Sequence, residues 1–385
     1  MVETGGWGGI AHYTWNLCRA LATEGAEVVL LTNTRYELAG LPSTFRVERS
    51  FDTAVGYLRT AGAFLRRLRA LDPDVVHLQS LISTRFDALL WPLVRWRAPL
   101  VMTAHNVRSH ESTPWENWTV WRCLQIADAV IVHTKESAAV VATRVSEETP
   151  VRVIHHGDYA FFAPPEIPCQ EEARHRLDLP RGAKLILAFG AIRPYKGILE
   201  LIATMPRIRA CHPGAHLVIA GPLMVGTKGE YREAIQKAGI EAAVVFRPQY
   251  VPHHSVAGYF AAADVAVYNY RDVTDSGSLR IACSLGTPVV ATSVGGFREF
   301  LTDGVTGRLV PPEAPELLVA AIGDMLADPA AAAKMASAAR KLAACAWSWA
   351  DSARATLEVY SAICAAPRPR HFDAGAPTQD GSARH

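Results

Sequence analysis

The sequence predicts an α/β protein with two doubly wound domains that face each other across a cleft. The chain has 385 residues, half of them apolar, which is too long for one core of ordinary size. It suits two domains of about 100–200 residues each. Short apolar segments alternate with helical segments, a pattern typical of mostly parallel sheets. This alternation occurs twice, before and after a proline-dense stretch at residues 163–168 that we interpret as a linker.

Candidate strands occur at similar spacing in both halves. Those of the first half cover residues 27–32, 45–49, 74–79, 100–104, 129–133 and 151–155. Those of the second half cover residues 185–189, 216–220, 244–247, 264–268, 289–292 and 307–310. We expect the first domain to span residues 1–164, the second 165–346, and a helix 347–365. Residues 366–385 are rich in proline, glycine, arginine and histidine, and we expect them to be disordered.

Composition narrows the function classes. A formal net charge of +2 does not favour nucleic-acid binding. Seven cysteines are scattered singly, which fits buried thiols in a reducing cytoplasm better than disulfides or a zinc site. No apolar run reaches the roughly 18 residues of a membrane span. The sequence therefore favours a cytoplasmic protein, and we find no P-loop, HExxH or paired-cysteine motif.

A glycine-rich loop opens the chain. Gly5-Gly6-Trp7-Gly8-Gly9 precedes an amphipathic helix from about residue 10 to residue 23. Such a loop normally follows a buried strand, yet Met1 and Val2 leave at most two residues for it. We therefore expect the chain as given to start late and its first sheet to lack most of a central strand.

The same loop partly matches a dinucleotide-binding fingerprint, Gly6-x-Gly8-x-x-Ala11. That fingerprint needs a carboxylate at the end of the next strand, where residues 32–35 read Thr-Asn-Thr-Arg. Without the carboxylate, we favour a loop that approaches a ligand across the cleft over a nicotinamide site.

The first basic segment, Gly190-Ala-Ile-Arg193-Pro-Tyr-Lys196-Gly197, lies where a strand ends and a helix begins. Strand carboxyl ends face the ligand crevice in open α/β sheets, and free N–H groups at a helix start favour an anion. Arg193 can offer a planar fork to phosphate oxygens, and Lys196 a point charge on a flexible stem. The pair suits a diphosphate. The alternative is a solvated loop with incidental basic residues.

A second helix start suited to an anion lies in residues 270–280, after the strand at 264–268. Ser276-Gly277-Ser278, followed by Leu279, lets backbone N–H groups approach a phosphate and adds hydroxyl donors. An ordinary Asp/Ser helix cap is the alternative. Two such starts at strand ends of one domain favour the ligand-binding interpretation.

His105 follows the buried strand at residues 100–104, within Thr103-Ala-His105-Asn106. This position at a strand carboxyl end favours a substrate contact, and a packed loop residue is the alternative. Asp72-Pro73-Asp74 spells an acidic metal-binding triplet, but it precedes a strand and so lies at the wrong end for the crevice. We interpret that triplet as a turn.

Taken in order, these segments resemble the family 4 glycosyltransferases of the GT-B fold. The resemblance runs from the glycine loop to the helix around Tyr360, and the ordered series is more specific than any single segment. The matching segments are Gly8-Gly9-Ile10, Asp74-Val-Val-His77, Thr103-Ala-His105-Asn106, Ile154-His-His156-Gly157, Arg193…Lys196-Gly197, Ala263-Asp264-Val, Ser276-Gly277, Gly286-Thr-Pro288 and Gly295-Gly-Phe-Arg-Glu299.

The resemblance implies two Rossmann-like domains with a C-terminal helix that crosses back onto the first. It also implies a retaining, metal-independent transfer from a nucleotide-sugar donor to a glycan or lipid-linked acceptor, without a cofactor. Arg193 and Lys196 match the family's two diphosphate-binding basic residues, and His105 matches the histidine that contacts the transferred sugar. Gly8 and Gly9 match the loop that closes over the diphosphate. The predicted donor-binding set also includes Gly190, Ser276, Gly277, Ser278 and Leu279.

The sequence departs from the family at one point. Many members carry two glutamates spaced E-x7-E, and these places fall on Val273 and Ile281. We expect Asp272 or Asp275 to reach the sugar hydroxyls instead. Glu299 is a further candidate, whose simpler interpretation is a helix-start carboxylate. The departure leaves two alternatives open: a catalytically weak nucleotide-sugar-binding relative, and a nucleotide-sugar epimerase of similar shape.

Two segments of the first domain mix apolar and basic residues. One is a predicted helix that carries Leu58, Arg59, Phe64, Leu65, Arg66, Arg67, Leu68 and Arg69, and the other is residues 89–97. Such surfaces can rest on anionic lipid, here as a peripheral contact on the inner face of a membrane. A packed helix with a solvated basic edge is the alternative.

Overall fold

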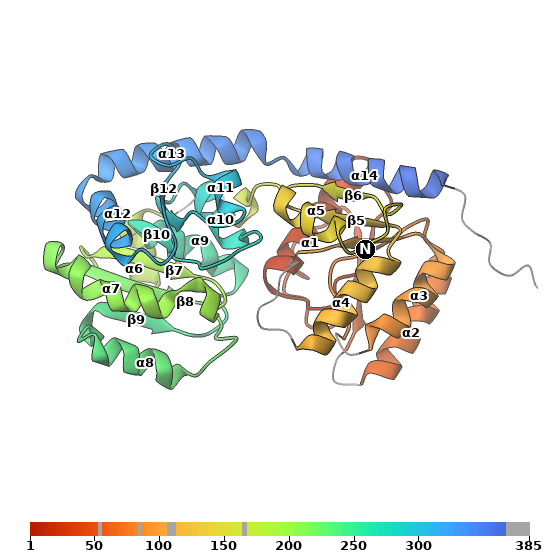
Figure 1. Ribbon diagram of the computed structural model, residues 1–385, viewed down its shortest axis with the longest axis horizontal. Helices are drawn as coiled ribbons and strands as arrows, with labels where there is room; N and C mark the ends of the chain where they lie inside the picture. The colour runs from red at the N-terminus through yellow and green to blue at the C-terminus, as the bar shows by residue number, and fades with distance from the viewer. Residues whose placement is uncertain (53–55, 84–85, 106–112, 164–167, 367–385) are drawn as a thin grey trace, which may run out of the picture.

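The computed structural model describes residues 1–52, 56–83, 86–105, 113–163 and 168–366 (Figure 1). Two α/β domains lie side by side and are bridged along one edge by the C-terminal helices. Asn106, the domain boundary predicted at 164/165 and all but the first residue of the predicted tail lie outside the described residues. Among the described residues, no helix combines the length and apolarity that a bilayer crossing requires.

The first domain is built on parallel strands. These are β1 (Val29–Asn33), β2 (Arg46–Phe51), β3 (Val76–Leu78), β4 (Leu100–Thr103), β5 (Ala129–Val132) and β6 (Val151–Val153). β1 pairs with β2, and β3, β4, β5 and β6 pair in that order. Every residue of β5 is fully buried, which is why this strand is a continuous apolar run without alternation. All strands predicted for this half are present, with ends shifted by at most two residues.

The N-terminal residues fill the centre of this sheet. Val2 pairs in parallel with Leu31 of β1 and with Leu78 of β3. Its N–H donates to the carbonyl of His77 at 2.8 Å, and its carbonyl accepts from the N–H of Gln79 at 2.8 Å. The central strand that we expected to be largely missing is thus represented by a few residues, and they join the two groups of strands.

Helices cover both faces of the first sheet. One face carries α2 (Tyr57–Leu71), α3 (Asp87–Arg97), α4 (Pro114–Ile126) and α5 (Lys135–Ala142), which share a hydrophobic core with the strands. The other face carries α1 (Gly8–Thr23) and the last helix, α14 (Trp349–Ala365). α14 follows the second domain in sequence but packs on the first.

The second domain contains one fully parallel sheet. Its strands are β7 (Lys184–Phe189), β8 (Ala215–Ala220), β9 (Val244–Arg247), β10 (Val265–Tyr268), β11 (Val289–Thr292) and β12 (Arg308–Val310). They pair in the order β12-β11-β10-β7-β8-β9, so the direction of winding reverses between β7 and β10. Ligand crevices in doubly wound sheets open at the carboxyl ends of the strands at such a reversal.

Helices also cover both faces of this second sheet. One face carries α6 (Gln170–Arg176), α9 (His253–Ala262), α10 (Gly277–Leu285) and α13 (Pro329–Ala346). The other carries α7 (Ile198–Cys211), α8 (Lys228–Lys237) and α12 (Pro315–Ala327). The prediction of two doubly wound domains is therefore confirmed.

The crossing from the second domain to the first occurs between α13 and α14 (Figure 1). α13 lies along the second domain, and α14 begins after Ser348, whose side chain caps the new helix. The indole N–H of Trp349 donates to the carbonyl of Asp158 at 2.6 Å. A Cβ at Gly157 would lie 2.3 Å from the Trp349 ring, so only glycine lets the indole dock there. These contacts confirm the predicted crossing helix.

Candidate active site

A pocket of about 560 Å³ lies between the two domains. Its second-domain wall is formed by the segments that follow β7, β8 and β10, so the pocket opens where the winding of that sheet reverses. The facing wall includes the glycine loop, the first residues of α1, and Ser80 and Leu81. Residues from both halves of the chain thus meet around one cavity.

Lys196 and Arg193 lie on the second-domain wall, in the single turn η3 (Pro194–Lys196) and just before it. Lys196 is only 8% exposed, and its Nζ lies 5.2 Å from the centre of the Tyr270 ring. Burial lowers the pKa of Lys196, and the charge of Arg193 adds to this effect. Within the described residues, no carboxylate pairs with Lys196. A buried cation beside the cavity is suited to a negatively charged ligand.

The start of α10 contributes the adjoining part of this wall. The hydroxyl of Ser276 accepts the N–H of Leu279 at 3.3 Å and so caps the helix. Ser276, Gly277 and Ser278 all line the pocket, together with Gly190 at the end of β7. The Ser278 hydroxyl donates to the carbonyl of Phe189 at 3.1 Å, which ties the helix start to that strand. The two predicted helix starts therefore lie side by side.

Asp275 also lines the pocket, but its carboxylate is held by an ion pair. The Nε of Arg280 donates to both oxygens, at 3.1 and 3.2 Å, and Arg280 is completely buried. The guanidinium carbon lies 3.9 Å from the centre of the Phe300 ring. Any sugar hydroxyl that donates a hydrogen bond to Asp275 would therefore use the lone pairs that Arg280 leaves available.

Three predicted donor-binding residues lie elsewhere. Leu279 is fully buried under the pocket and offers its N–H to the helix cap. Asp272 does not line the pocket. Glu299 is exposed on the short helix α11 (Phe297–Phe300), also away from the pocket. Their roles in donor binding stay predictions.

The glycine loop forms the first-domain wall, with Gly8 and Gly9 at the start of α1. Glu3, which precedes the loop, is 1% exposed and accepts the N–H groups of Gly5 (2.8 Å) and Gly6 (3.0 Å). Burial raises the pKa of this carboxyl group, although these bonds oppose the shift. Glu3 and His12 line the pocket but were not predicted, because an isolated acid or histidine carries no spacing signal.

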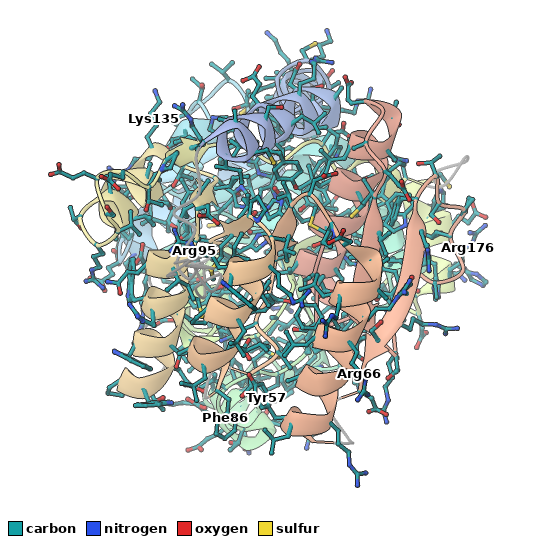
Figure 2. The ribbon with its side chains drawn as sticks, turned by 90° about the vertical axis from the view of Figure 1, so that its right-hand side faces the viewer. Tyr57, Arg66, Phe86, Arg95, Lys135 and Arg176 are labelled. Atoms are coloured by element: carbon teal, nitrogen blue, oxygen red, sulfur yellow. The ribbon has the colours of Figure 1, made fainter. Side chains whose placement is uncertain are left out.

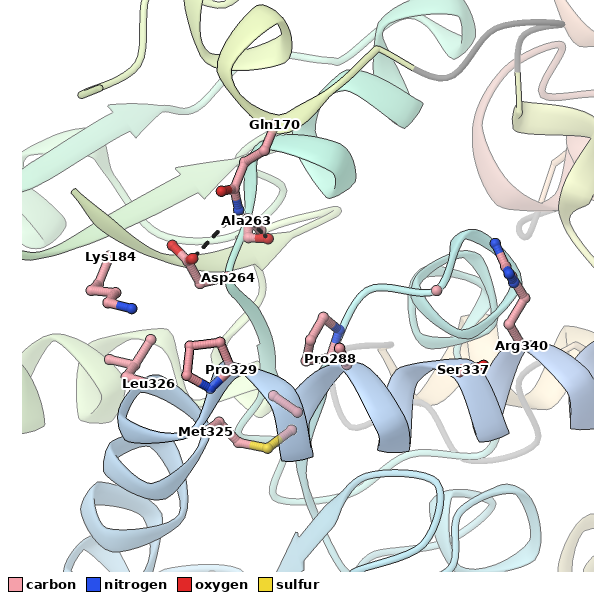
Figure 3. A pocket seen from close by; sticks show the side chains of 13 residues that line it. Gln170, Lys184, Ala263, Asp264, Pro288, Met325, Leu326, Pro329, Ser337 and Arg340 are labelled. Atoms are coloured by element: carbon pink, nitrogen blue, oxygen red, sulfur yellow. Dashed lines mark hydrogen bonds between the residues drawn. The ribbon is translucent and has the colours of Figure 1, made fainter. Parts of the chain in front are cut away.

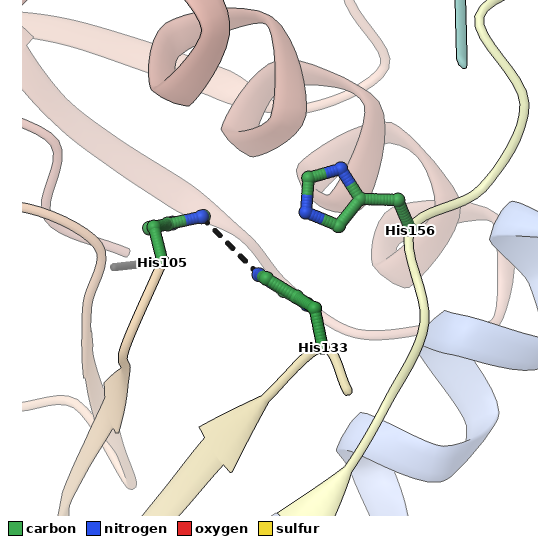
Figure 4. Close-up of side chains that lie close together, drawn as sticks. All are labelled: His105, His133 and His156. Atoms are coloured by element: carbon green, nitrogen blue, oxygen red, sulfur yellow. Dashed lines mark hydrogen bonds between the residues drawn. The ribbon is translucent and has the colours of Figure 1, made fainter. Parts of the chain in front are cut away.

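His105 is half-buried and clusters with the buried His133 and His156 (Figure 4). Its Nδ1 lies 3.2 Å from Nε2 of His133, and its Nε2 lies 2.9 Å from Oε1 of Gln79. The ring of Tyr13 packs against all three imidazoles. His105 does not line the pocket wall, so its predicted contact with the transferred sugar stays a prediction.

The same three histidines could hold a metal ion, because one nitrogen of each lies within 4.8 Å of the others. Burial lowers the pKa of each imidazole, in the case of His133 to about 4, so all three are neutral at pH 7. Neutral imidazole is a metal ligand, but it is also the form that a hydrogen-bonded network needs. Hydrogen-bond contacts hold His105 against His133 and Gln79, and Nδ1 of His156 lies 3.0 Å from the Tyr159 hydroxyl oxygen. That the protein needs no metal stays a prediction.

A second cavity, of about 360 Å³, lies at the opposite end of the second-domain sheet (Figure 3). Its lining includes Lys184, Asp264 and Pro288, which stand at or just before the amino ends of β7, β10 and β11. Because ligand crevices open at the carboxyl ends, we assign the site to the pocket between the domains. There, two helix starts and two cations can bind a phosphorylated group and stabilise negative charge.

Comparisons with known proteins agree with this assignment. Residues 7–157 match the family described as Glycosyltransferase Family 4, and residues 170–342 match Glycosyl transferases group 1. A D-inositol 3-phosphate glycosyltransferase of Streptomyces avermitilis is 32% identical over 317 residues, which cover 77% of this chain and 67% of that protein. The chain belongs to the family 4 glycosyltransferases.

Two further likenesses place this glycosyltransferase among its relatives. A D-inositol 3-phosphate glycosyltransferase of Corynebacterium efficiens is 29% identical over 343 residues, 84% of this chain and 79% of that one. The structure of Anabaena HepE in complex with UDP-glucose has a TM-score of 0.77 at 20% identity, and covers 94% of this chain and 98% of that one. The GT-B fold and the enzyme class predicted from the sequence are thereby confirmed.

Proposed function

We propose that this glycosyltransferase moves a sugar from a nucleotide-sugar donor to a glycan or lipid-linked acceptor, with retention and without a metal. The observation that carries the proposal is the buried Lys196, which has no carboxylate partner among the residues that the structure describes and lies beside Arg193 before α7, at the interdomain pocket. Burial lowers the pKa of Lys196, because a buried charge loses its hydration. Keeping this amine charged costs free energy unless a ligand supplies the opposite charge. The diphosphate of a donor supplies it.

The geometry suggests how this chain would lower the barrier to transfer. As the bond between the sugar and the phosphate breaks, negative charge grows on the departing phosphate. Lys196, Arg193 and the start of α10 line the same pocket, and we propose that they surround this charge. Such preformed donors stabilise the transition state more than the ground state, because the charge they face is larger there.

Relatives guide the choice of substrates. HepE was solved with UDP-glucose, and two relatives are named for D-inositol 3-phosphate. We therefore propose UDP-sugars as the first donors to test, with polyol phosphates, glycans and lipid-linked sugars as acceptors. The proposal of retention rests on the family resemblance.

A transfer assay with EDTA present tests the proposal, on wild type, Lys196→Ala and the control Lys184→Ala. Lys184 lies at the second cavity, away from the cleft. We expect kcat to fall about 10²- to 10³-fold in Lys196→Ala, as for loss of one transition-state donor, and to be unchanged in the control. Donor binding without turnover would instead indicate a binding-only relative. Donor conversion without an acceptor would indicate an epimerase.

We also propose that the first domain rests on an anionic membrane through α2, α3 and α4. These helices lie side by side (Figures 1 and 2). They carry large apolar side chains that are exposed to solvent. Leu58, Leu89 and Trp96 are 84%, 77% and 74% exposed. Phe64 and Leu68, which the sequence also offered as part of this surface, are buried in the core instead. Exposed arginines on the same helices, among them Arg66, supply the charge that attracts anionic lipid.

Sedimentation with phosphatidylglycerol vesicles tests this surface. We expect Leu89→Ser/Trp96→Ser to bind vesicles less than wild type, because these side chains would enter the lipid interface. Leu317→Ser, at an exposed position of α12 on the second domain, is the control. Equal binding by all three proteins, or binding to neutral vesicles alone, would contradict the proposal.

A further inference from the structure

One carboxylate connects residues of both pocket walls without lining the pocket itself. Glu37 lies in the turn after β1, behind the glycine loop. Its Oε1 accepts the N–H of Gly8 at 3.1 Å and is in ion-pair contact with Nε2 of His12. Its Oε2 accepts the hydroxyl proton of Tyr250, which belongs to the second domain. Gly8, His12 and Tyr250 all line the pocket.

The backbone of Glu37 holds the same loop from a second point. Its N–H donates to the carbonyl of Gly6 at 2.9 Å. Gly6 has a φ of +76°, and a Cβ there would approach Cβ of Asn33 to 2.6 Å, so the loop is tightly packed at this residue. Trp7, between the two attachment points, meets the Tyr250 ring edge-on with centres 5.1 Å apart. The glycine loop is thus fixed to Glu37 and touches the other domain beside it.

The contacts favour an ionised Glu37. Its side chain is 14% exposed, and burial alone would raise its pKa. The contact with His12 and the hydrogen bonds from Tyr250 and Gly8 outweigh burial and hold the pKa of Glu37 below its usual value. Hydrogen bonds to an ionised acceptor are roughly twice as strong as neutral ones. The bond from Tyr250 is therefore a strong link between the domains.

We propose that Glu37 is a positioning residue that clasps the two domains together over the bound donor. The inference rests on the proposed function, because it assigns the pocket to a nucleotide sugar. Closing the cleft brings Tyr250 to Glu37, and the same carboxylate holds Gly8 and His12 at the pocket. Donor binding and clasp formation then favour the same closed arrangement, so each strengthens the other. Loss of the clasp weakens donor binding without removing a donor contact made by Glu37.

Tyr250→Phe is the decisive variant, because it keeps the ring against Trp7 and removes only the hydroxyl. We expect the donor Kd, measured by calorimetry with UDP-glucose and the other nucleotide sugars, to rise about tenfold to hundredfold. Tyr231→Phe, on α8 outside the cleft, is the control and should bind like wild type. Glu37→Gln retains an acceptor for Tyr250 but loses the charge, so it should lie between wild type and Glu37→Ala.

The double variant Glu37→Ala/Tyr250→Phe separates a clasp from two independent effects. If the residues act together, the double variant binds no more weakly than Glu37→Ala. Additive losses, or wild-type affinity in Tyr250→Phe, would overturn the inference. Small-angle scattering of the donor-free proteins keeps this test distinct from the proposed function. Without any donor, Glu37→Ala should be more open than wild type, and an unchanged radius of gyration would also overturn the inference.

Discussion

At the scale of single residues, Gly197 shows how tightly the basic segment is held. It has a φ of +61°, and a Cβ there would lie 2.1 Å from the carbonyl oxygen of Asn269. Its own carbonyl accepts the Asn269 side-chain amide at 3.1 Å. These contacts fix the loop after β7 to the loop after β10, so they set the position of Lys196 relative to α10.

We therefore predict that Gly197→Ala lowers the free energy of unfolding by more than backbone strain alone would. Gly239 has a similar φ of +65° with open space around it, so Gly239→Ala is a matched control. The control should lower the free energy of unfolding by about 1–2 kcal/mol, the cost of left-handed backbone in a residue with a Cβ. Gly197→Ala should lose more, measured by urea unfolding, and should also bind donor more weakly. Equal losses in the two variants would contradict the claim that a Cβ at residue 197 collides with Asn269.

Because of Lys196, we predict that stability and donor affinity change with pH in opposite directions. Its pKa is lowered from 10.5 in the folded protein, so between the lowered value and 10.5 the unfolded chain holds more protons. The free energy of unfolding should therefore rise with pH in that window. Donor affinity should fall with pH through the lowered pKa, because the amine loses the charge that attracts the diphosphate. Lys196→Met should show neither change in unfolding titrations and calorimetry. A wild type that behaves like this variant would contradict the prediction.

At the scale of residues, sequence patterns at the ends of strands predicted part of the pocket wall. Arg193, Lys196 and Ser276 line the pocket because each follows a strand whose carboxyl end faces it. Glu37 and Tyr250 could not be found in this way. Their link spans 213 positions and exists only when two domains meet, so no local spacing carries it.

At the scale of elements, the start of α10 combines a helix cap that lines the pocket with a buried ion pair. Asp275 precedes the cap, and its partner Arg280 lies in the first turns of the helix. Both side chains are almost inaccessible, at 4% and 0% exposure. Removing one partner would leave the other charge buried and unpaired, which is far more costly than loss of a surface pair.

We predict that Asp275→Asn lowers the free energy of unfolding by about 3–5 kcal/mol. Asp275→Asn/Arg280→Met should recover most of this loss, because it removes both charges. Glu172→Gln breaks the exposed pair with Arg176 and should cost less than about 1 kcal/mol. Urea unfolding followed by circular dichroism measures all three. A double variant less stable than Asp275→Asn would contradict the account.

Elements were more predictable than side-chain arrangements. Buried parallel strands are apolar runs, so β5 and β11 were visible in the sequence within one residue of their ends. The amphipathic pattern of α2 was also visible, but periodicity could not separate its buried Phe64 from its exposed Leu58. The cluster of His105, His133 and His156 needs the register of β4, β5 and β6, which the sequence does not show.

At the scale of the whole molecule, the pocket exists because two domains with the same winding face each other. Two strand series around a proline-dense linker were enough to predict that architecture. The crossing of α14 was implied by the family resemblance alone, since its docking depends on the contact between Gly157 and Trp349. The contacts of Trp7 and Glu37 with Tyr250 join the two domains, so they exist only in the assembled chain.

The central claim is that a nucleotide-sugar diphosphate binds between Arg193, Lys196 and the start of α10. A thermal-shift screen against UDP-, GDP- and ADP-sugars without metal tests it most directly, on wild type, Arg193→Ala and the exposed control Arg232→Ala. A donor at 100 times its Kd should stabilise wild type and the control by about 2.7 kcal/mol, and Arg193→Ala far less. No stabilisation of folded wild type by any donor, or an equal shift in Arg193→Ala, would contradict the account.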